Sequence, residues 1–153
     1  MKAYLQRLLQ HADWANRRIL DSLQKTELAE QRPWRLLAHV LAAERIYLER
    51  ARGLDPWPQN FWPELSPEQG AALIVENGFA YKKFFAGLAE NDLDASVKYR
   101  NSKGIEFHTP IKDLLTHVAQ HGAYHRGQIA LLIRNAGHEP VNTDFIAFVR
   151  GKK

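Results

Sequence analysis

The stretch LLTHVAQHGAYHRGQIALLIRNAGHEP, residues 114–140, decides the fold. Its apolar residues recur every three or four positions, as they do on one face of an α-helix. Thr109 and Pro110 predict the N-cap and the first turn of this helix, and Gly137 predicts its end. Its middle carries histidines at four-residue intervals: His117, His121 and His125. Residues four apart are neighbours on a helix surface, so pairs of these imidazoles can meet.

Three more stretches show the same apolar periodicity: residues 2–23, 33–51 and 67–88. Pro33 suits a first helical turn, and Gly53 predicts the end of that helix. Ser66 and Gln69 predict a capping box at the start of the third helix. Four amphipathic helices bury their apolar faces most simply against one another, so we expect an all-α fold, a four-helix bundle.

Two connections are too long to be simple turns. Residues 53–67 combine prolines with three aromatic residues and predict a long crossover, or the rim of a pocket in which Trp57 and Trp62 are the pocket candidates. Residues 96–110 alternate around the turn sequence NSKG and predict a short β-hairpin before the last helix. The final residues, 143–153, predict a short capping segment.

Composition narrows the range of functions. The 153 residues fit one domain, 1–153, and the formal net charge is only +4. The basic residues form no stripe interleaved with aromatics, so no nucleic-acid partner is expected. Cysteine is missing, which excludes disulfides, thiolate nucleophiles and cysteine zinc sites. No apolar run approaches the length of a membrane span or suits a signal peptide, so a cytoplasmic location without membrane partners is expected.

The histidine spacing alone leaves several interpretations open. Either His117 with His121 or His121 with His125 can converge on one metal ion, but all three cannot, because the outer two lie about 12 Å apart along the axis. His39, on or beside the apolar face of the second helix, is a candidate ligand from another helix, and Glu44 is a candidate base, weak ligand or acceptor. The alternatives are a histidine dyad for acid–base catalysis, or histidines that only fill the core.

Five segments together carry a family resemblance: ADWANRRIL (12–20), LAHVLAAERIYLERARG (37–53), YRNSKGIEF (99–107), residues 114–140 and NTDFIAFVR (142–150). In these segments the chain resembles the DinB family, the damage-inducible type of helical metalloprotein. The resemblance implies a single DinB-like domain over residues 1–153 and a four-helix bundle of DinB-like type. Its motifs also imply three histidine ligands for a divalent ion: His39, His121 and His125. His117 then becomes a neighbour one turn away.

The resemblance also implies what such a site does. Three neutral imidazoles leave a coordination position open, which is typical of a catalytic metal, with zinc or nickel as the expected ion. Members of the wider superfamily use a metal to activate a low-molecular-weight thiol. We therefore expect a metal-dependent transferase or hydrolase acting on a small molecule, with a non-catalytic metal-binding or stress-response protein as the alternative. A homodimer is expected from the same resemblance.

The surroundings of the ion are predicted by position in the helices and connections. Glu44 and Asn16 are expected to hydrogen-bond near the ligands. Trp57, Trp62 and the hairpin residues 99–107 are expected to form the walls of the approach. His11, His108 and His138 are expected to be surface or structural residues.

Overall fold

The structure, a computed structural model, describes residues 1–55 and 57–151. Its elements in chain order are α1 (Lys2–Lys25), α2 (Arg32–Ala51), α3 (Pro67–Gly87), the short 3-10 helix η1 (Glu90–Asp94), β1 (Ser96–Arg100), β2 (Glu106–Pro110), α4 (Ile111–Asn135) and α5 (Phe145–Val149). The fold is therefore mostly helical with one small antiparallel sheet, as the periodicity predicted.

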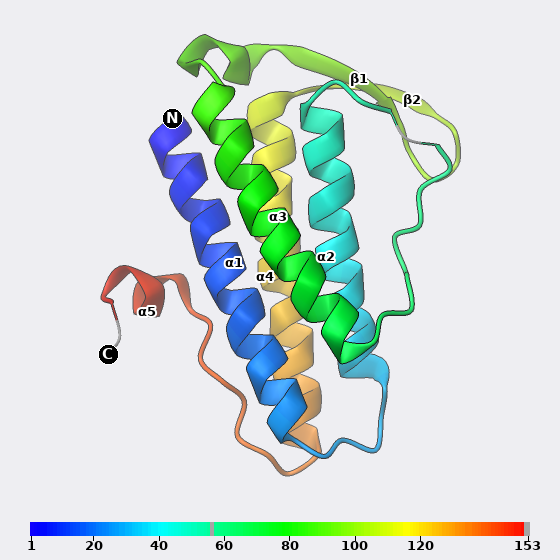
Figure 1. Cartoon of the computed structure of the whole chain (residues 1–153), viewed down its shortest axis with the longest axis vertical. Coiled ribbons are helices and arrows are strands. Elements are labelled where there is room, and N and C mark those ends of the chain that lie inside the picture. Colours follow the sequence, from blue (N-terminus) through cyan, green and yellow to red (C-terminus); the bar gives the residue numbers. More distant parts are fainter. Residues whose placement is uncertain (56, 152–153) are drawn as a thin grey trace.

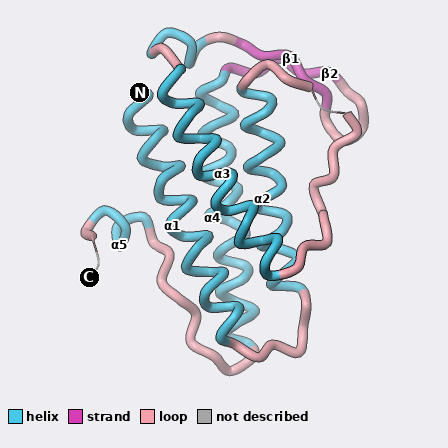
Figure 2. The backbone as a smooth tube through the Cα atoms, viewed as in Figure 1, coloured by secondary structure: helices cyan, strands magenta, loops and turns pink. Residues whose placement is uncertain are grey.

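The four long helices lie side by side, and α2 packs closely against α4 (Figure 1). Helices α2 and α3 run in the same direction, while α1 and α4 run the opposite way. Residues 57–66 make this possible, because they return along the length of α2 before α3 begins (Figure 2). The long crossover expected from the sequence is thus present.

Local signals explain where most helices begin and end. Ser66 and Gln69 form the capping box at the start of α3: the Gln69 N–H donates to Ser66 Oγ, and the Ser66 N–H donates to Gln69 Oε1. Gly53 and Gly137 adopt positive φ angles of 76° and 84° just beyond the ends of α2 and α4. These positions favour glycine, which has no Cβ to clash.

The predicted start of the last helix is wrong by one residue. Strand β2 continues through Pro110, and Thr109 pairs with Val97 of β1. The Thr109 hydroxyl lies 3.2 Å from the Tyr99 hydroxyl and gives α4 no side-chain cap. Thr109 therefore pairs with β1 and does not form the helix cap that the sequence suggested.

The apolar interior is divided into two clusters. One lies around Leu9, Phe85 and Leu115 and the other around Ile19, Leu37 and Ile129. Buried polar side chains, one from each long helix, accompany these clusters: Asn16, Glu44, Asn77 and Arg126. We call these four residues the polar layer.

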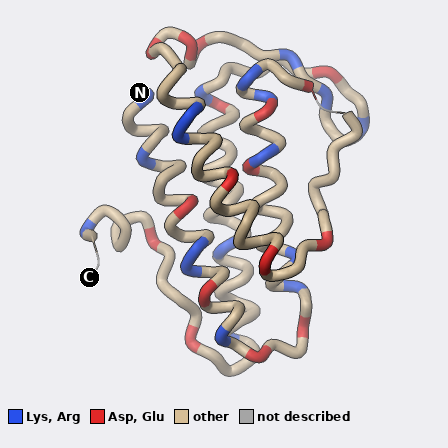
Figure 3. The backbone as a smooth tube through the Cα atoms, viewed as in Figure 1, with Lys and Arg blue, Asp and Glu red and all other residues tan. Residues whose placement is uncertain are grey.

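The charged residues are interspersed along the helices rather than sorted by sign (Figure 3). None of the helices in the described part of the chain combines the length and the apolar character that crossing a membrane requires.

Candidate metal centre

Three histidines from two helices converge on one point. His39 lies on α2, and His121 and His125 lie one turn apart on α4. Each offers a ring nitrogen, and these nitrogen atoms all lie within 4.8 Å of one another. The Nε2 atoms of His39 and His121 are 3.1 Å apart. Two nitrogens bound to one tetrahedral ion would stand about 3.3 Å apart, so the arrangement fits a small divalent ion.

Hydrogen bonds orient two of the three rings. His39 Nδ1 donates to the carbonyl oxygen of Phe61 at 2.6 Å, and His125 Nδ1 donates to Gln128 Oε1 at 2.8 Å. A carbonyl oxygen only accepts, so each Nδ1 carries the proton and each Nε2 keeps its lone pair. Ligating histidines in metal sites are held by the same kind of partner.

Burial keeps the imidazoles of His121 and His39 neutral by lowering the pKa of each. It lowers the pKa of His121 to about 4, with further lowering from the neighbouring His125, His39 and His117. Burial also lowers the pKa of His39. Neutral imidazole is the form that binds a metal ion, so these rings do not have to lose a proton at neutral pH.

One side of the histidine group is covered and another is open. The Trp62 ring stacks on the His39 ring, with centroids 3.8 Å apart and planes 7° apart. Beside His125 lies an open depression of about 680 Å³, to which Arg32, Arg35 and Tyr124 contribute. A small molecule can therefore approach the histidines from the side of His125.

The predicted walls of this approach are partly wrong. Trp62 lines the depression as expected, but Trp57 lies 3.6 Å from the position a Cβ would take on Gly104, beside the hairpin. The part of the hairpin between residues 99 and 107 is likewise not among the described residues that line the depression. Trp57 instead faces Arg100, whose guanidinium lies 5.4 Å from the centre of its ring.

The predicted role of Glu44 and Asn16 is also wrong. Asn16 Nδ2 donates to Glu44 Oε1 at 2.8 Å, and Arg126 Nη1 donates to Asn16 Oδ1 at 3.0 Å. Both residues therefore belong to the polar layer, and neither is among the hydrogen-bond partners described for the three histidines. A position five residues beyond His39 on a helix points about 140° away from it, which explains the difference.

The remaining histidines stand apart from the group. His117 is exposed, and its ring lies 4.6 Å from that of Tyr47 and 5.4 Å from that of His121. His11 is buried against α5, and its Nε2 donates to the Thr143 carbonyl oxygen. His108 and His138 are exposed. These positions agree with the surface or structural roles expected for the last three.

Comparison with known protein families agrees with the resemblance found in the sequence. A model described as "DinB family" matches residues 1–152. The chain belongs to the DinB family. "Protein DinB" of Bacillus subtilis (strain 168) is 25% identical over 163 residues, an alignment that covers 95% of this chain and 93% of that protein.

Two groups that hold the histidine rings in this DinB family chain were not predicted from its sequence. Gln128 follows His125 by three residues, and helix spacing could have identified it as a partner. The carbonyl group of Phe61 carries no signal in the sequence, because it depends on how residues 57–66 fold back over α2.

Stacking of Trp62 on His39 gives a direct optical readout. Adding Cu²⁺ or Ni²⁺ is expected to quench the fluorescence of Trp62, because an open-shell ion held by His39 would lie beside the indole. The quenching amplitude should fall in Trp62→Phe and stay unchanged in Trp14→Phe, since Trp14 packs against α5 instead. Equal quenching in wild type and Trp62→Phe would contradict this placement of the ion.

Removal of the ion is expected to leave the helices intact. The two apolar clusters are assembled without any contribution from the histidine group, and burial of apolar surface is the main stabilising contribution to a fold. Far-ultraviolet circular dichroism before and after chelation should therefore show the same helical signal, with only a lower melting temperature. Loss of the helical signal on chelation would show that the ion is structural.

Proposed function

We propose that this protein binds one divalent ion through His39, His121 and His125 and uses it as a metal-dependent enzyme on a small molecule. Zinc or nickel is the proposed ion, because imidazole suits both. The observation that supports the proposal best is the convergence of three ring nitrogens within 4.8 Å beside an open depression. We also propose that the four long helices form the bundle typical of the family.

A group of three histidine ligands is more typical of a catalytic metal site than of a structural metal site. Structural zinc sites are usually closed by four protein ligands, whereas catalytic sites keep one position free. Among the residues that the structure describes, the convergent group consists of three histidines and includes no carboxylate. When bound, a divalent ion with a free position supplies Lewis-acid activation of a water or a thiol.

The residues of the chain contribute binding and orientation. Phe61 and Gln128 hold the rings of His39 and His125 in place, and Trp62 covers the outer face of His39. Arg32 and Arg35 line the depression and favour a substrate with a carboxylate, although Glu30 lies on the same rim. Transfer of a low-molecular-weight thiol to an electrophilic carbon, or hydrolysis of an ester or amide, is the proposed chemistry.

A screen of metal-loaded protein tests this proposal. Small thiols are paired with electrophilic acceptors, each with and without a carboxylate, and simple esters and amides are tested separately. Turnover is expected with metal-loaded wild type and not with chelated protein or with His125→Ala. Turnover that survives both chelation and His125→Ala would contradict a metal-dependent reaction at this site.

One observation favours a non-catalytic alternative. Glu44, a candidate base, weak ligand or acceptor in the sequence, is hydrogen-bonded within the polar layer instead. A protein that binds and holds an ion without catalysis needs no such base. If metal-loaded protein binds its ion tightly and the whole screen shows no turnover, sequestration or a stress-response role becomes the better proposal.

The family resemblance supports one further proposal, a homodimer. Sedimentation velocity at micromolar concentration is expected to show a species of twice the chain mass. A single monomeric species would contradict it.

A further inference from the structure

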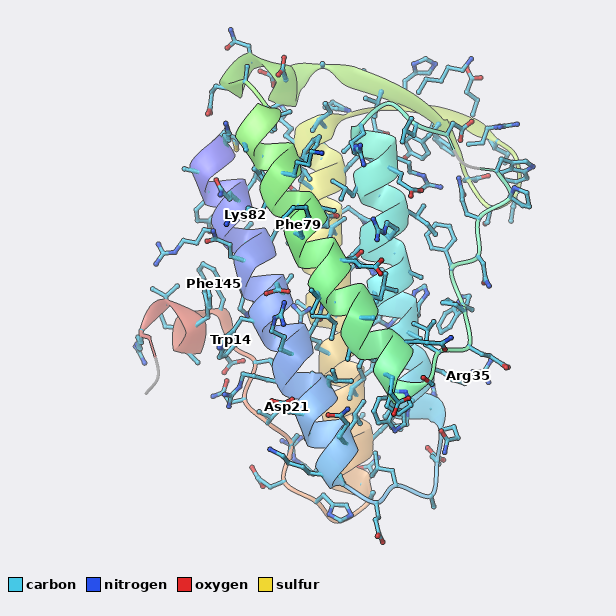
Figure 4. All side chains as sticks on the ribbon, viewed as in Figure 1. Trp14, Asp21, Arg35, Phe79, Lys82 and Phe145 are labelled. Carbon is cyan, nitrogen blue, oxygen red and sulfur yellow. The ribbon has the colours of Figure 1, made fainter. Side chains whose placement is uncertain are left out.

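A second cavity lies on another side of the protein, between α1 and α3. Its volume is about 390 Å³, and it shares no lining residue with the depression beside His125. Figure 4 labels Phe79 and Lys82 of α3, both of which line this cavity. We call it the α1–α3 cleft. Small-molecule sites in proteins commonly enclose about 300–1,000 Å³, far more than one water molecule needs.

The cleft has an apolar wall and a polar floor. Leu9, Ile74 and Phe85 contribute apolar surface, and Asn16, Glu44 and Asn77 contribute polar atoms. All six side chains are buried in the fold. A ligand pocket typically combines apolar walls with a few convergent polar groups, and the α1–α3 cleft has this composition.

One polar atom of the floor has no partner. Asn77 Nδ2 donates to the carbonyl oxygen of Leu41 at 2.9 Å, but Asn77 Oδ1 accepts no hydrogen bond from any described residue. The Asn77 side chain is only 2% exposed. Nearly all buried polar atoms in proteins are hydrogen-bonded, so this oxygen indicates a donor that comes from outside the chain.

Charged groups at the buried end of the cleft have partners, and Lys82, which also lines the cleft, is exposed. Arg17 donates two hydrogen bonds of 3.0 Å to the carboxylate of Asp13 on the rim. In the polar layer, Asn16 bridges Glu44 and the guanidinium of Arg126, which is also buried. A ligand with a full charge at its buried end would find no unpaired opposite charge there, and burial of an unpaired charge is costly.

From this geometry we propose that the α1–α3 cleft binds a small uncharged molecule with an apolar, ring-sized body and an N–H or O–H donor head group. The head group donates to Asn77 Oδ1, and the body packs against Leu9, Ile74 and Phe85. This site is separate from the three histidines, and the proposal does not depend on the proposed enzyme function.

Four probes of similar size separate the features of such a ligand: benzamide, benzoate, protonated benzylamine and toluene. Each is titrated into the ¹⁵N-labelled full-length chain and followed by NMR. Benzamide is expected to shift resonances of α1 and α3, including the side-chain amides of Asn16 and Asn77, with a Kd of about 1 mM for a ligand of this size. The other three probes should bind at least about tenfold more weakly.

A blocking variant tests the location. Gln10 is exposed on α1 and lines the cleft, so Gln10→Trp can fill the cavity without replacing a core residue. Gln24→Trp places the same side chain on an exposed position of α1 away from the cleft and serves as the control. Benzamide binding should weaken at least about tenfold in Gln10→Trp and remain unchanged in Gln24→Trp.

Three results would overturn the proposal. They are no cleft shifts with benzamide, benzamide shifts that persist in Gln10→Trp, and binding of toluene or of a charged probe as tightly as benzamide. The first two would show that the cleft takes no such ligand, and the third would show that Asn77 does not select the head group.

Discussion

Replacing Glu44 by alanine is expected to lower the free energy of unfolding by about 2–3 kcal/mol, because the change breaks a buried hydrogen-bond network that links Glu44, Asn16 and Arg126. It also removes the acceptor for Asn16 Nδ2. Urea denaturation followed by circular dichroism at neutral pH measures the loss. The matched control is Glu49→Ala, on the same helix but partly exposed, which should change stability by less than about 1 kcal/mol. A loss for Glu44→Ala as small as that of the control would contradict this role for the polar layer.

The same carboxyl group predicts a pH dependence with a definite sign. Burial raises the pKa of Glu44 from 4.5 to about 7, although hydrogen bonds and the positive charge of Arg126 oppose the rise. The folded protein therefore holds the proton between these two pH values and the unfolded chain does not. The raised pKa of Glu44 therefore adds its full contribution to the free energy of unfolding below pH 4.5. This contribution is lost as the pH rises through about 7.

Glu44→Gln isolates this effect, since the amide does not titrate. The stability of wild type relative to Glu44→Gln should fall by roughly 3 kcal/mol over that pH interval. Buried histidines such as His121, whose pKa values are lowered, shift stability in the opposite direction, but they are present in both proteins and cancel in the difference. A difference that stays constant with pH would show that Glu44 ionises normally.

The second large effect is on metal binding. Alanine in place of His39, His121 or His125 is expected to weaken the affinity for a divalent ion by more than about 100-fold, since even loss of a hydrogen bond to a ligand costs about 10–100-fold. Metal content after gel filtration and competition with a chromogenic chelator measure it. His117→Ala, one turn away on α4, and His138→Ala are the controls and should keep full metal content. Full metal content in His121→Ala would contradict the assignment.

Sequence reasoning succeeded where a signal is local and periodic. The four long helices, the capping box at Ser66 and the glycine at position 137 follow from spacing and from the residues nearest each end. The hairpin was predictable because a turn sequence separates two short extended runs. His39 was a candidate ligand from its place on the apolar face of its helix. The choice of His121 and His125 as its partners followed only from the family resemblance, because helix spacing allowed His117 with His121 as well.

Apart from Gln128, the missed features depend on contacts between distant segments. Gly127 has open space around it, because a Cβ there would meet nothing within 4 Å. It is Gly122 that makes room, because a Cβ at that position would lie 2.7 Å from Arg126 Nη1. The side chain of Arg126 folds back over its own helix to reach Asn16, 110 residues away in the sequence. No local pattern predicts that contact, so the polar layer could not be recognised from the sequence.

The central claim is that His39, His121 and His125 hold one divalent ion with a coordination position left free. Anomalous diffraction from crystals of the metal-loaded full-length chain tests it most directly. We expect one anomalous peak about 2.0–2.1 Å from a ring nitrogen of each of the three histidines, with solvent at the remaining coordination position. A peak held by His117, or a fourth protein side chain closing the coordination sphere, would contradict it.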